Sequence, residues 1–153
     1  MMSNEQEIKC IKIINNMTAQ LSTDGRTILI VEDHDELRET LLEWLKSVFS
    51  DCTFLVAGSG EKAIELAEAH QPAIVLMDIQ LPGINGIEAI RRIKKISPQT
   101  QALILSVMNV SAYRDEALAA GACAYINKQH MHVELIPALN KLLSLHTTEE
   151  EEP

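Results

Sequence analysis

The sequence predicts an open, doubly wound α/β fold, in which helices cover both faces of a five-stranded parallel sheet. The first observation is the order of patterns from Arg26 onward, where short apolar runs alternate with segments whose apolar residues recur at helical spacing. The second is the run "AIVLM" at 73–77, which is apolar throughout, as is typical of a strand covered on both faces. A length of 153 residues fits one such domain with short additions.

Each element follows from its own local pattern, because apolar runs indicate strands and apolar residues spaced by three or four indicate helices. Ser111 is the expected N-cap of the fourth helix, and Gly121 is its expected end. Pro137 lacks an amide hydrogen, so the last helix is expected to begin only a few residues before it or to bend there. The predicted strands are 27–31, 53–58, 73–77, 102–106 and 122–127, and the predicted helices are 35–49, 60–70, 86–96, 111–121 and a segment within 132–146.

Residues 26–146 form the predicted domain, and a short segment flanks it on either side. In residues 1–25 apolar side chains repeat every three or four positions, which is enough for one amphipathic helix that packs on the domain or on a partner. A mobile leader is the alternative interpretation of this segment. Residues 147–153, "TTEEEEP", are expected to form a solvated acidic tail, because like charges repel one another and hydrate well.

Composition and charge exclude several classes of function. A hydrophobic content of 46% and a charged content of 23% are those of a globular protein, and the net charge of −9 argues against non-specific binding to nucleic acid or to acidic membranes. The three cysteines form no CxxC pair, so free thiols in a reducing compartment are expected. The sequence shows no membrane-spanning run and no secretory signal, and a cytoplasmic location follows as an expectation.

Polar residues stand where four of the predicted strands end. Glu32 and Asp33 follow the first strand, Asp78 the third and Lys128 the fifth, while Ser106 ends the fourth. Open parallel sheets bind their ligands outside the carboxyl ends of the strands, so these groups are expected to meet on one rim. Asp78 taken alone would be interpreted as a helix cap or a turn residue. Because the other four polar groups are expected on the same rim, the sequence favours a functional site there.

Three carboxylates on one rim require compensation. Two unit charges about 4 Å apart repel by roughly 4 kcal/mol at an effective dielectric constant of 20, so the cluster must spread, protonate or hold a cation. Oxygen ligands suit Mg²⁺, with Mn²⁺ as the alternative, and an ion of charge +2 together with Lys128 would balance the three acids. A neutralised aspartate beside a metal, a hydroxyl group and an ammonium group can attack phosphorus and form an acyl phosphate.

Four motifs carry a resemblance to a known family. "ILIVEDH", "VLMDIQLPGINGIEAIRRIK", "LILSV" and "AYINK" occur in order and resemble the receiver domain of two-component response regulators over residues 26–146. The segments "LPGINGIEAIRRIK" and "LSVMN" are most similar to the NarL/FixJ-like branch of these receiver domains. The resemblance implies a (βα)5 flavodoxin-like fold and a phosphoacceptor signalling domain rather than an enzyme. Its phosphoryl group would come from a sensor histidine kinase or a histidine phosphotransfer protein and would go to Asp78.

The same resemblance implies a role for each group on the rim. Asp33 and Asp78 would ligate Mg²⁺ together with the backbone carbonyl of Gln80, and Glu32 would act directly or through water. Ser106 and Lys128 would contact the phosphoryl group, and Tyr125 would be the aromatic residue that rotates on the output face. A plain strand-end hydroxyl for Ser106 and a half-buried strand tyrosine for Tyr125 stay open as structural interpretations.

The output of the domain follows from what remains of the chain. Only 25 residues come after Lys128 (153 − 128), and they are taken up by the last helix and the acidic tail, so no DNA-reading or catalytic module is expected. The expected partner is therefore a downstream protein, with a homodimer also compatible. Two alternatives stay open: a truncated piece of a DNA-binding transcriptional regulator, and a receiver-like interaction module that is not phosphorylated.

Two other classes with related features are disfavoured. A haloacid-dehalogenase-like phosphatase would need a second acid two positions after Asp78, where Gln80 stands. A flavodoxin-like FMN-binding protein would need a phosphate loop rich in hydroxyl groups and glycine after the first strand, and none is present in the sequence.

Overall fold

The computed structural model describes residues 26–108 and 110–151, and side chains as far as Leu145. The amphipathic helix predicted within 1–25 lies outside the described residues. The strands are β1 (Thr27–Val31), β2 (Thr53–Ala57), β3 (Ile74–Asp78), β4 (Gln101–Ser106) and β5 (Ala122–Asn127). The helices are α2 (Asp35–Val48), α3 (Gly60–His70), α4 (Gly86–Ile96), α5 (Ser111–Ala120) and α6 (Met131–Glu151), with a 3-10 turn η1 (Lys128–His130) before α6.

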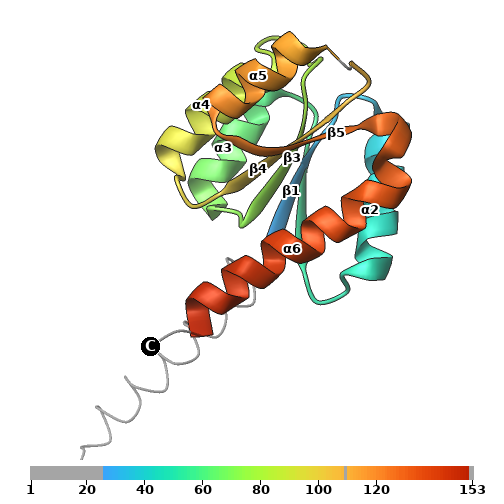
Figure 1. Ribbon diagram of the computed structural model, residues 1–153, viewed down its shortest axis with the longest axis vertical. Coiled ribbons are helices and arrows are strands. Elements are labelled where there is room, and N and C mark those ends of the chain that lie inside the picture. The colour runs from blue at the N-terminus through green and yellow to red at the C-terminus, as the bar shows by residue number, and fades with distance from the viewer. Residues whose placement is uncertain (1–25, 109, 152–153) are drawn as a thin grey trace, which may run out of the picture.

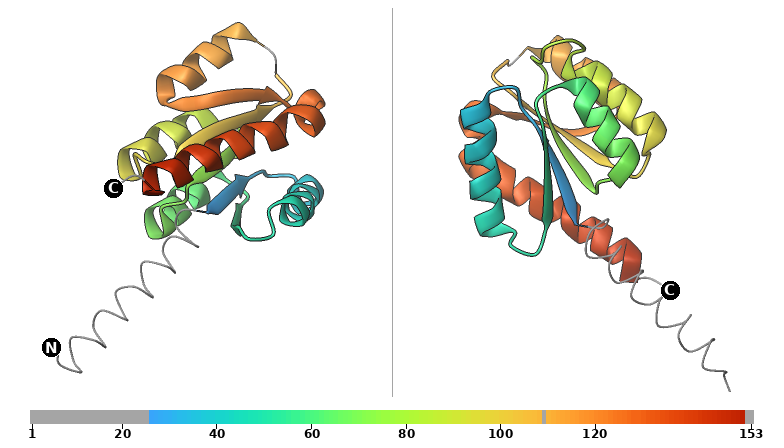
Figure 2. Two further views of the ribbon diagram at one scale, coloured as in Figure 1. Left: turned by 60° about the horizontal axis from the view of Figure 1, so that its bottom comes forward. Right: turned by 180° about the vertical axis from the view of Figure 1, so that it is seen from behind.

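The strands form one parallel sheet in the order β2-β1-β3-β4-β5 (Figure 1). Helices α3, α4 and α5 pack on one face of this sheet, and α2 and α6 pack on the other, as the two views of Figure 2 show. The predicted fold class, a doubly wound five-stranded α/β sheet, is therefore confirmed.

The core consists of two aliphatic layers, one on each face of the sheet. Leu29 and Val31 of β1 point to the layer under α3, α4 and α5, whereas Ile28 and Ile30 point to the layer under α2 and α6. Successive side chains alternate between the faces because a strand has a period of two residues. The same alternation continues along β3 and places Asp78 at its end on the side of α2 and α6.

The N-cap of α5 differs from the prediction by one residue. Val110, not Ser111, is the N-cap, and no side chain makes a capping hydrogen bond there. The Val110 carbonyl accepts hydrogen bonds from the amides of Tyr113 and Arg114, so the hydrogen-bond ladder of the helix already begins at this residue. The predicted end of the helix is confirmed, because Gly121 adopts the left-handed conformation with φ 115°.

The last helix is longer than predicted at both ends. It begins at Met131, continues through Pro137 and ends at Glu151, instead of lying within 132–146. The proline is exposed, and glutamate is a good helix former, so the chain can extend the helix where charge repulsion alone suggested a tail. Within the part of the chain that the structure describes, no helix combines the length and apolar character needed to cross a membrane.

Candidate functional site

The predicted groups lie along the carboxyl edge of the sheet. Glu32 and Asp33 follow β1, and Asp78 is the last residue of β3, the strand that pairs with β1. Ser106 ends β4 in register with the last residue of β5, and Lys128 begins η1 directly after it. The parallel pairing of the strands thus brings groups that are far apart in sequence to one rim.

Lys128 joins two of the acids directly. Its Nζ atom lies 3.0 Å from Oε1 of Glu32 and 3.1 Å from Oδ2 of Asp78. All three side chains are shielded from solvent, with exposed fractions of 12% for Lys128, 2% for Glu32 and 7% for Asp78. A buried cation between two carboxylates stabilises the pair of acids, and loss of the cation would leave both charges without compensation.

Burial and the close contact between charges shift the protonation of this group. Burial raises the pKa of Glu32 to about 7, with Asp78 adding to the rise and Lys128 opposing it. Burial alone would lower the pKa of Lys128, but its contacts with Glu32 and Asp78 outweigh that effect and raise it. The ammonium group therefore stays charged, whereas the raised pKa makes Glu32 easier to protonate than an ordinary carboxyl group.

Two carboxylate oxygens on the rim fit a metal ion. Oε2 of Glu32 and Oδ1 of Asp33 are buried and accept no hydrogen bond from the described residues. Buried carboxylate oxygens are costly unless something compensates them, and hard divalent cations bind such oxygens. These residues therefore suit Mg²⁺, the ion that the sequence predicts.

The loop that follows Asp78 is folded back against it. The amide of Gln80 donates to Oδ1 of Asp78 over 3.2 Å, and the amide of Gly86 donates to the carbonyl of Ile79 over 2.9 Å. A side chain at Gly86 would collide with the backbone carbonyl of Asp78, so only glycine permits this approach. The loop thus places the Gln80 backbone beside the Asp78 carboxylate.

Ser106 and Tyr125, the two predicted switch residues, meet on the backbone of Met108. The Met108 amide donates to Oγ of Ser106 over 3.0 Å, and the Tyr125 hydroxyl donates to the Met108 carbonyl over 2.6 Å. The guanidinium group of Arg114 lies 5.4 Å from the centre of the Tyr125 ring. The hydrogen bond that the structure gives the Ser106 hydroxyl is thus directed to the segment before α5 rather than to Asp78.

Sequence reasoning missed several residues that support the site. Arg38 donates from Nη1 to the backbone carbonyl of Glu32 over 2.8 Å and from Nη2 to Oδ1 of Asp35 over 2.6 Å, which holds the loop after β1. Met108 was not predicted as a link between Ser106 and Tyr125, although a serine two residues ahead of it is a known turn signal. Arg38 carries no comparable signal, because it acts through a backbone atom.

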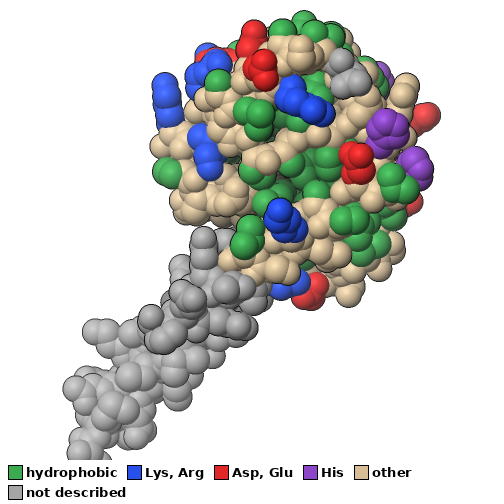
Figure 3. All heavy atoms as spheres, viewed as in Figure 1, with side chains coloured by type: hydrophobic (Ala, Val, Ile, Leu, Met, Phe, Trp, Pro, Cys, Tyr) green, Lys and Arg blue, Asp and Glu red, His purple; other side chains and the backbone are tan. Residues whose placement is uncertain are grey.

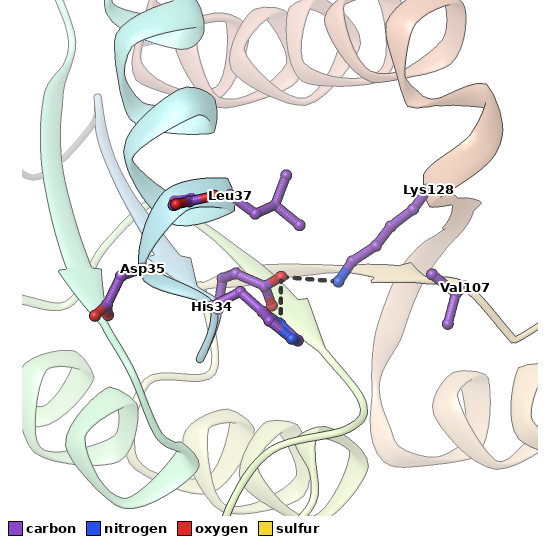
Figure 4. Close-up of a pocket in the computed structure, with 7 residues that line it drawn as sticks. His34, Asp35, Leu37, Val107 and Lys128 are labelled. Carbon is purple, nitrogen blue, oxygen red and sulfur yellow. Dashed lines mark hydrogen bonds and ion pairs between the residues drawn. The ribbon is translucent and has the colours of Figure 1, made fainter.

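A cavity of about 600 Å³ opens beside these groups (Figure 4). In this view Lys128 and His34 approach the same carboxylate oxygen from different sides, as the dashed lines mark. The walls of the cavity are partly apolar, because Leu37 and Val107 line it together with the charged groups. The lining residues are Glu32, His34, Asp35, Glu36, Leu37, Val107 and Lys128.

Comparison with known proteins identifies the family. The sequence profile of the response regulator receiver domain matches residues 28–140. The chain belongs to this family. Receiver domains are signalling domains of two-component systems, and the recognition made from the four sequence motifs is confirmed.

Individual relatives agree with this assignment. The chemotaxis protein CheY of Thermotoga maritima is 36% identical over 121 residues, which are 77% of this chain and 98% of that protein. The nitrate/nitrite response regulator protein NarL of Escherichia coli (strain K12) is 35% identical over 116 residues, 75% of this chain but 53% of NarL. This receiver chain therefore spans about half the length of NarL.

A solved structure confirms the fold. The CheY-like response regulator receiver domain protein of Methanospirillum hungatei JF-1 superposes with a TM-score of 0.75, covering 81% of this chain and 98% of that one at 23% identity. A likeness at this identity concerns the arrangement of strands and helices alone.

Proposed function

We propose that this receiver domain accepts a phosphoryl group on Asp78, with Mg²⁺ bound beside it, and that the modification switches a protein-interaction face. The observation that supports the proposal most is the Lys128 ammonium group, held 3.0 Å from Glu32 and 3.1 Å from Asp78 at the carboxyl edge of the sheet. Membership of the receiver family supports the same function.

The reaction transfers the phosphoryl group from a phosphohistidine of a sensor histidine kinase or of a histidine phosphotransfer protein. A carboxylate oxygen of Asp78 attacks phosphorus, the P–N bond breaks, and the histidine nitrogen keeps the electron pair. Lys128 and the Ser106 hydroxyl bind the oxygens of the incoming phosphoryl group, which stabilises the charge that builds up on them. The domain assists its own phosphorylation and slow dephosphorylation but catalyses no turnover of a separate substrate.

Asp33, Asp78 and the backbone carbonyl of Gln80 would hold the Mg²⁺ ion, with Glu32 helping directly or through water. The buried oxygens of Glu32 and Asp33 that lack a hydrogen-bond partner among the described residues support this ligand set. When bound, Mg²⁺ supplies positive charge to the acids and to the phosphoryl oxygens.

The switch runs through Met108. A phosphoryl group on Asp78 attracts the Ser106 hydroxyl away from the Met108 amide. The Met108 backbone then moves, and the hydrogen bond that its carbonyl accepts from the Tyr125 hydroxyl changes with it. The face formed by α5, β5 and α6, on which apolar side chains gather (Figure 3), then changes its shape for a downstream protein. A second copy of the chain is another occupant of this face. In this function the domain acts in the cytoplasm and does not itself contact nucleic acid.

Intact mass spectrometry after incubation with acetyl phosphate tests the proposal. In the presence of Mg²⁺ we expect one added phosphoryl group, which Asp78→Asn abolishes and EDTA blocks. The exposed Asp115 provides a matched control, because Asp115→Asn should leave the modification intact. A protein that takes up no phosphoryl group would instead be an interaction module that is not phosphorylated.

A further inference from the structure

His34 stands beside the acids, yet the proposed phosphoryl transfer does not use it. It occupies the N-cap position of α2 and makes no side-chain capping hydrogen bond, although an N-cap side chain normally accepts one from the helix. Its Nδ1 atom lies 3.3 Å from Oδ1 of Asp33 and 3.6 Å from Oε1 of Glu32 instead (Figure 4). The imidazole is thus turned toward the acids and away from the helix.

The spacing of these three residues fits a shared metal ion. One ligand atom each from Glu32, Asp33 and His34 lies within 4.8 Å of the others. Two neighbouring ligands of an octahedral ion, each about 2.1 Å from the metal, lie roughly 3 Å apart. The 3.3 Å between the His34 nitrogen and the Asp33 oxygen is close to that separation, so both atoms can reach one ion with little movement.

The carboxylates offer electron pairs that the described residues do not use. The Glu32 side chain is 2% exposed, and its Oε2 atom has no hydrogen-bond partner among the described residues. Lys128 contacts the other oxygen, Oε1, and therefore leaves Oε2 available. Oδ1 of Asp33 is also buried and accepts no hydrogen bond from the described residues, and it is closer to the imidazole nitrogen than Oε1 of Glu32 is.

We infer that His34 supplies a nitrogen ligand to the divalent ion held by Glu32 and Asp33, and thereby makes the site prefer Mn²⁺ to Mg²⁺. This inference rests on the metal site of the proposed function. Mg²⁺ takes oxygen ligands and keeps several waters, whereas an imidazole nitrogen strengthens the binding of first-row transition ions. The His34 side chain is 75% exposed, so the ring can adjust to the ion without disturbing the core.

A second role for His34, as a cation that only balances the charge of the acids, predicts a different effect on metal binding. If the imidazole served only as a cation that balances the acids, it would compete with any metal ion. Its removal would then tighten the binding of Mg²⁺ and Mn²⁺ alike. A nitrogen ligand affects Mn²⁺ selectively, so the two roles differ in the sign of the effect on Mn²⁺.

Metal titrations of the EDTA-treated protein separate these roles. The electron paramagnetic resonance signal of free Mn²⁺ gives the Mn²⁺ affinity, and competition with Mg²⁺ gives the Mg²⁺ affinity. His34→Ala should weaken Mn²⁺ binding by about tenfold and change Mg²⁺ binding by less than about twofold. His70→Ala, at the exposed C-terminal end of α3, is the matched control and should change neither affinity.

The ligand itself can be observed by pulsed electron paramagnetic resonance. Bound Mn²⁺ should show coupling to a nitrogen nucleus in the wild-type protein and in His70→Ala, and this coupling should be absent in His34→Ala. Absence of nitrogen coupling in the wild type, or a tighter binding of both ions by His34→Ala, would overturn the inference. Failure to bind Mn²⁺ at all would do the same.

A phosphorylation assay distinguishes a failure of this inference from a failure of the proposed function. His34→Ala should still take one phosphoryl group from acetyl phosphate with Mg²⁺, because Asp33, Asp78 and Lys128 are intact. If it does so while its ion preference equals that of the wild type, the role of His34 is wrong and the phosphoacceptor function stands. If the wild type shows nitrogen coupling but takes no phosphoryl group, the proposed function is wrong and the nitrogen ligand stands.

Discussion

Glu32 lies in surroundings that differ strongly from those of an ordinary, solvated carboxyl group, because its side chain is almost fully buried beside another acid. Burial raises its pKa to about 7, and the nearby Asp78 charge adds to the rise in spite of the contact with Lys128. A divalent ion at the rim must therefore compete with a proton on Glu32 near neutral pH, because metal ligands bind in their deprotonated form.

This shift predicts how the stability of the metal-free protein depends on pH. The pKa of Glu32 rises from 4.5 to about 7 on folding, so between these values the native state binds more protons than the unfolded state. Stability then falls as the pH rises through this window, and the protonated acid stabilises the fold at the lower end. In EDTA we expect the melting temperature to fall on the order of 5 °C between pH 5 and pH 7.5, as calorimetry would measure.

Glu32→Gln is the variant that isolates this effect. It removes the titrating group and keeps an acceptor for Lys128, so its melting temperature should be less dependent on pH over the same window. Glu39→Gln, an exposed acid of α2, should retain the wild-type dependence. Equal slopes for the wild type and Glu32→Gln would contradict the assignment of the pH dependence to Glu32.

At the scale of elements, the loop between β3 and α4 owes its shape to a side chain of α3. Oε1 of Glu61 accepts from the amide of Ile84 over 2.9 Å, and this hydrogen bond lowers the pKa of Glu61. Gly83 lies in the left-handed region with φ 76°, and a side chain there would meet the Glu61 carboxylate. The carboxylate thus fixes the loop that places the Gln80 backbone beside Asp78.

Removal of this carboxylate should loosen the loop and leave the sheet intact. In Glu61→Ala we expect the Ile84 amide to exchange with solvent on the order of tenfold faster, because it loses a charged acceptor. Mg²⁺ binding should weaken, while Asp78 should still accept a phosphoryl group. Hydrogen exchange followed by NMR measures the first effect, and Glu65→Ala on the same helix serves as control. Unchanged protection of Ile84 would show that the loop holds its shape without Glu61.

The elements that the sequence predicted well are those whose pattern is set by burial. The strand β3 lies between two helical layers, so its apolar run was unambiguous, and the position of Asp78 at its end followed. Helix ends were less predictable, because the hydrogen bonds of Val110 and the continuation of α6 past Pro137 depend on backbone geometry. Contacts with backbone atoms, such as those of Arg38 and Glu61, leave no periodic signal in the sequence.

At the scale of the whole molecule, β4 and β5 connect the rim to the face formed by α5, β5 and α6. Ser106 ends β4 on the rim, and Tyr125 lies on β5 between α5 and α6. Both contact Met108, whose amide and carbonyl serve one residue each. A change at Asp78 can therefore reach the face formed by α5, β5 and α6 through one peptide segment, provided that the Ser106 hydroxyl responds to the phosphoryl group.

This connection predicts that Ser106 and Tyr125 act one after the other along the same route. On phosphorylation we expect hydrogen exchange of α5 to change in the wild type and to change little in Ser106→Ala, which still accepts the phosphoryl group. Tyr125→Phe removes the bond to the Met108 carbonyl and should give an intermediate response. In a double-mutant cycle the two losses should not add, because residues in one network act together.

Tyr113→Phe is the control for the loss of a hydroxyl group, since Tyr113 lies on α5 itself and is also half-buried. It should respond to phosphorylation as the wild type does. If the double variant Ser106→Ala, Tyr125→Phe kept the full exchange response of α5, the signal would have to leave the rim by another route. Lys128 would be the first candidate for that route. It contacts Asp78, and it begins η1, the short turn that leads into α6.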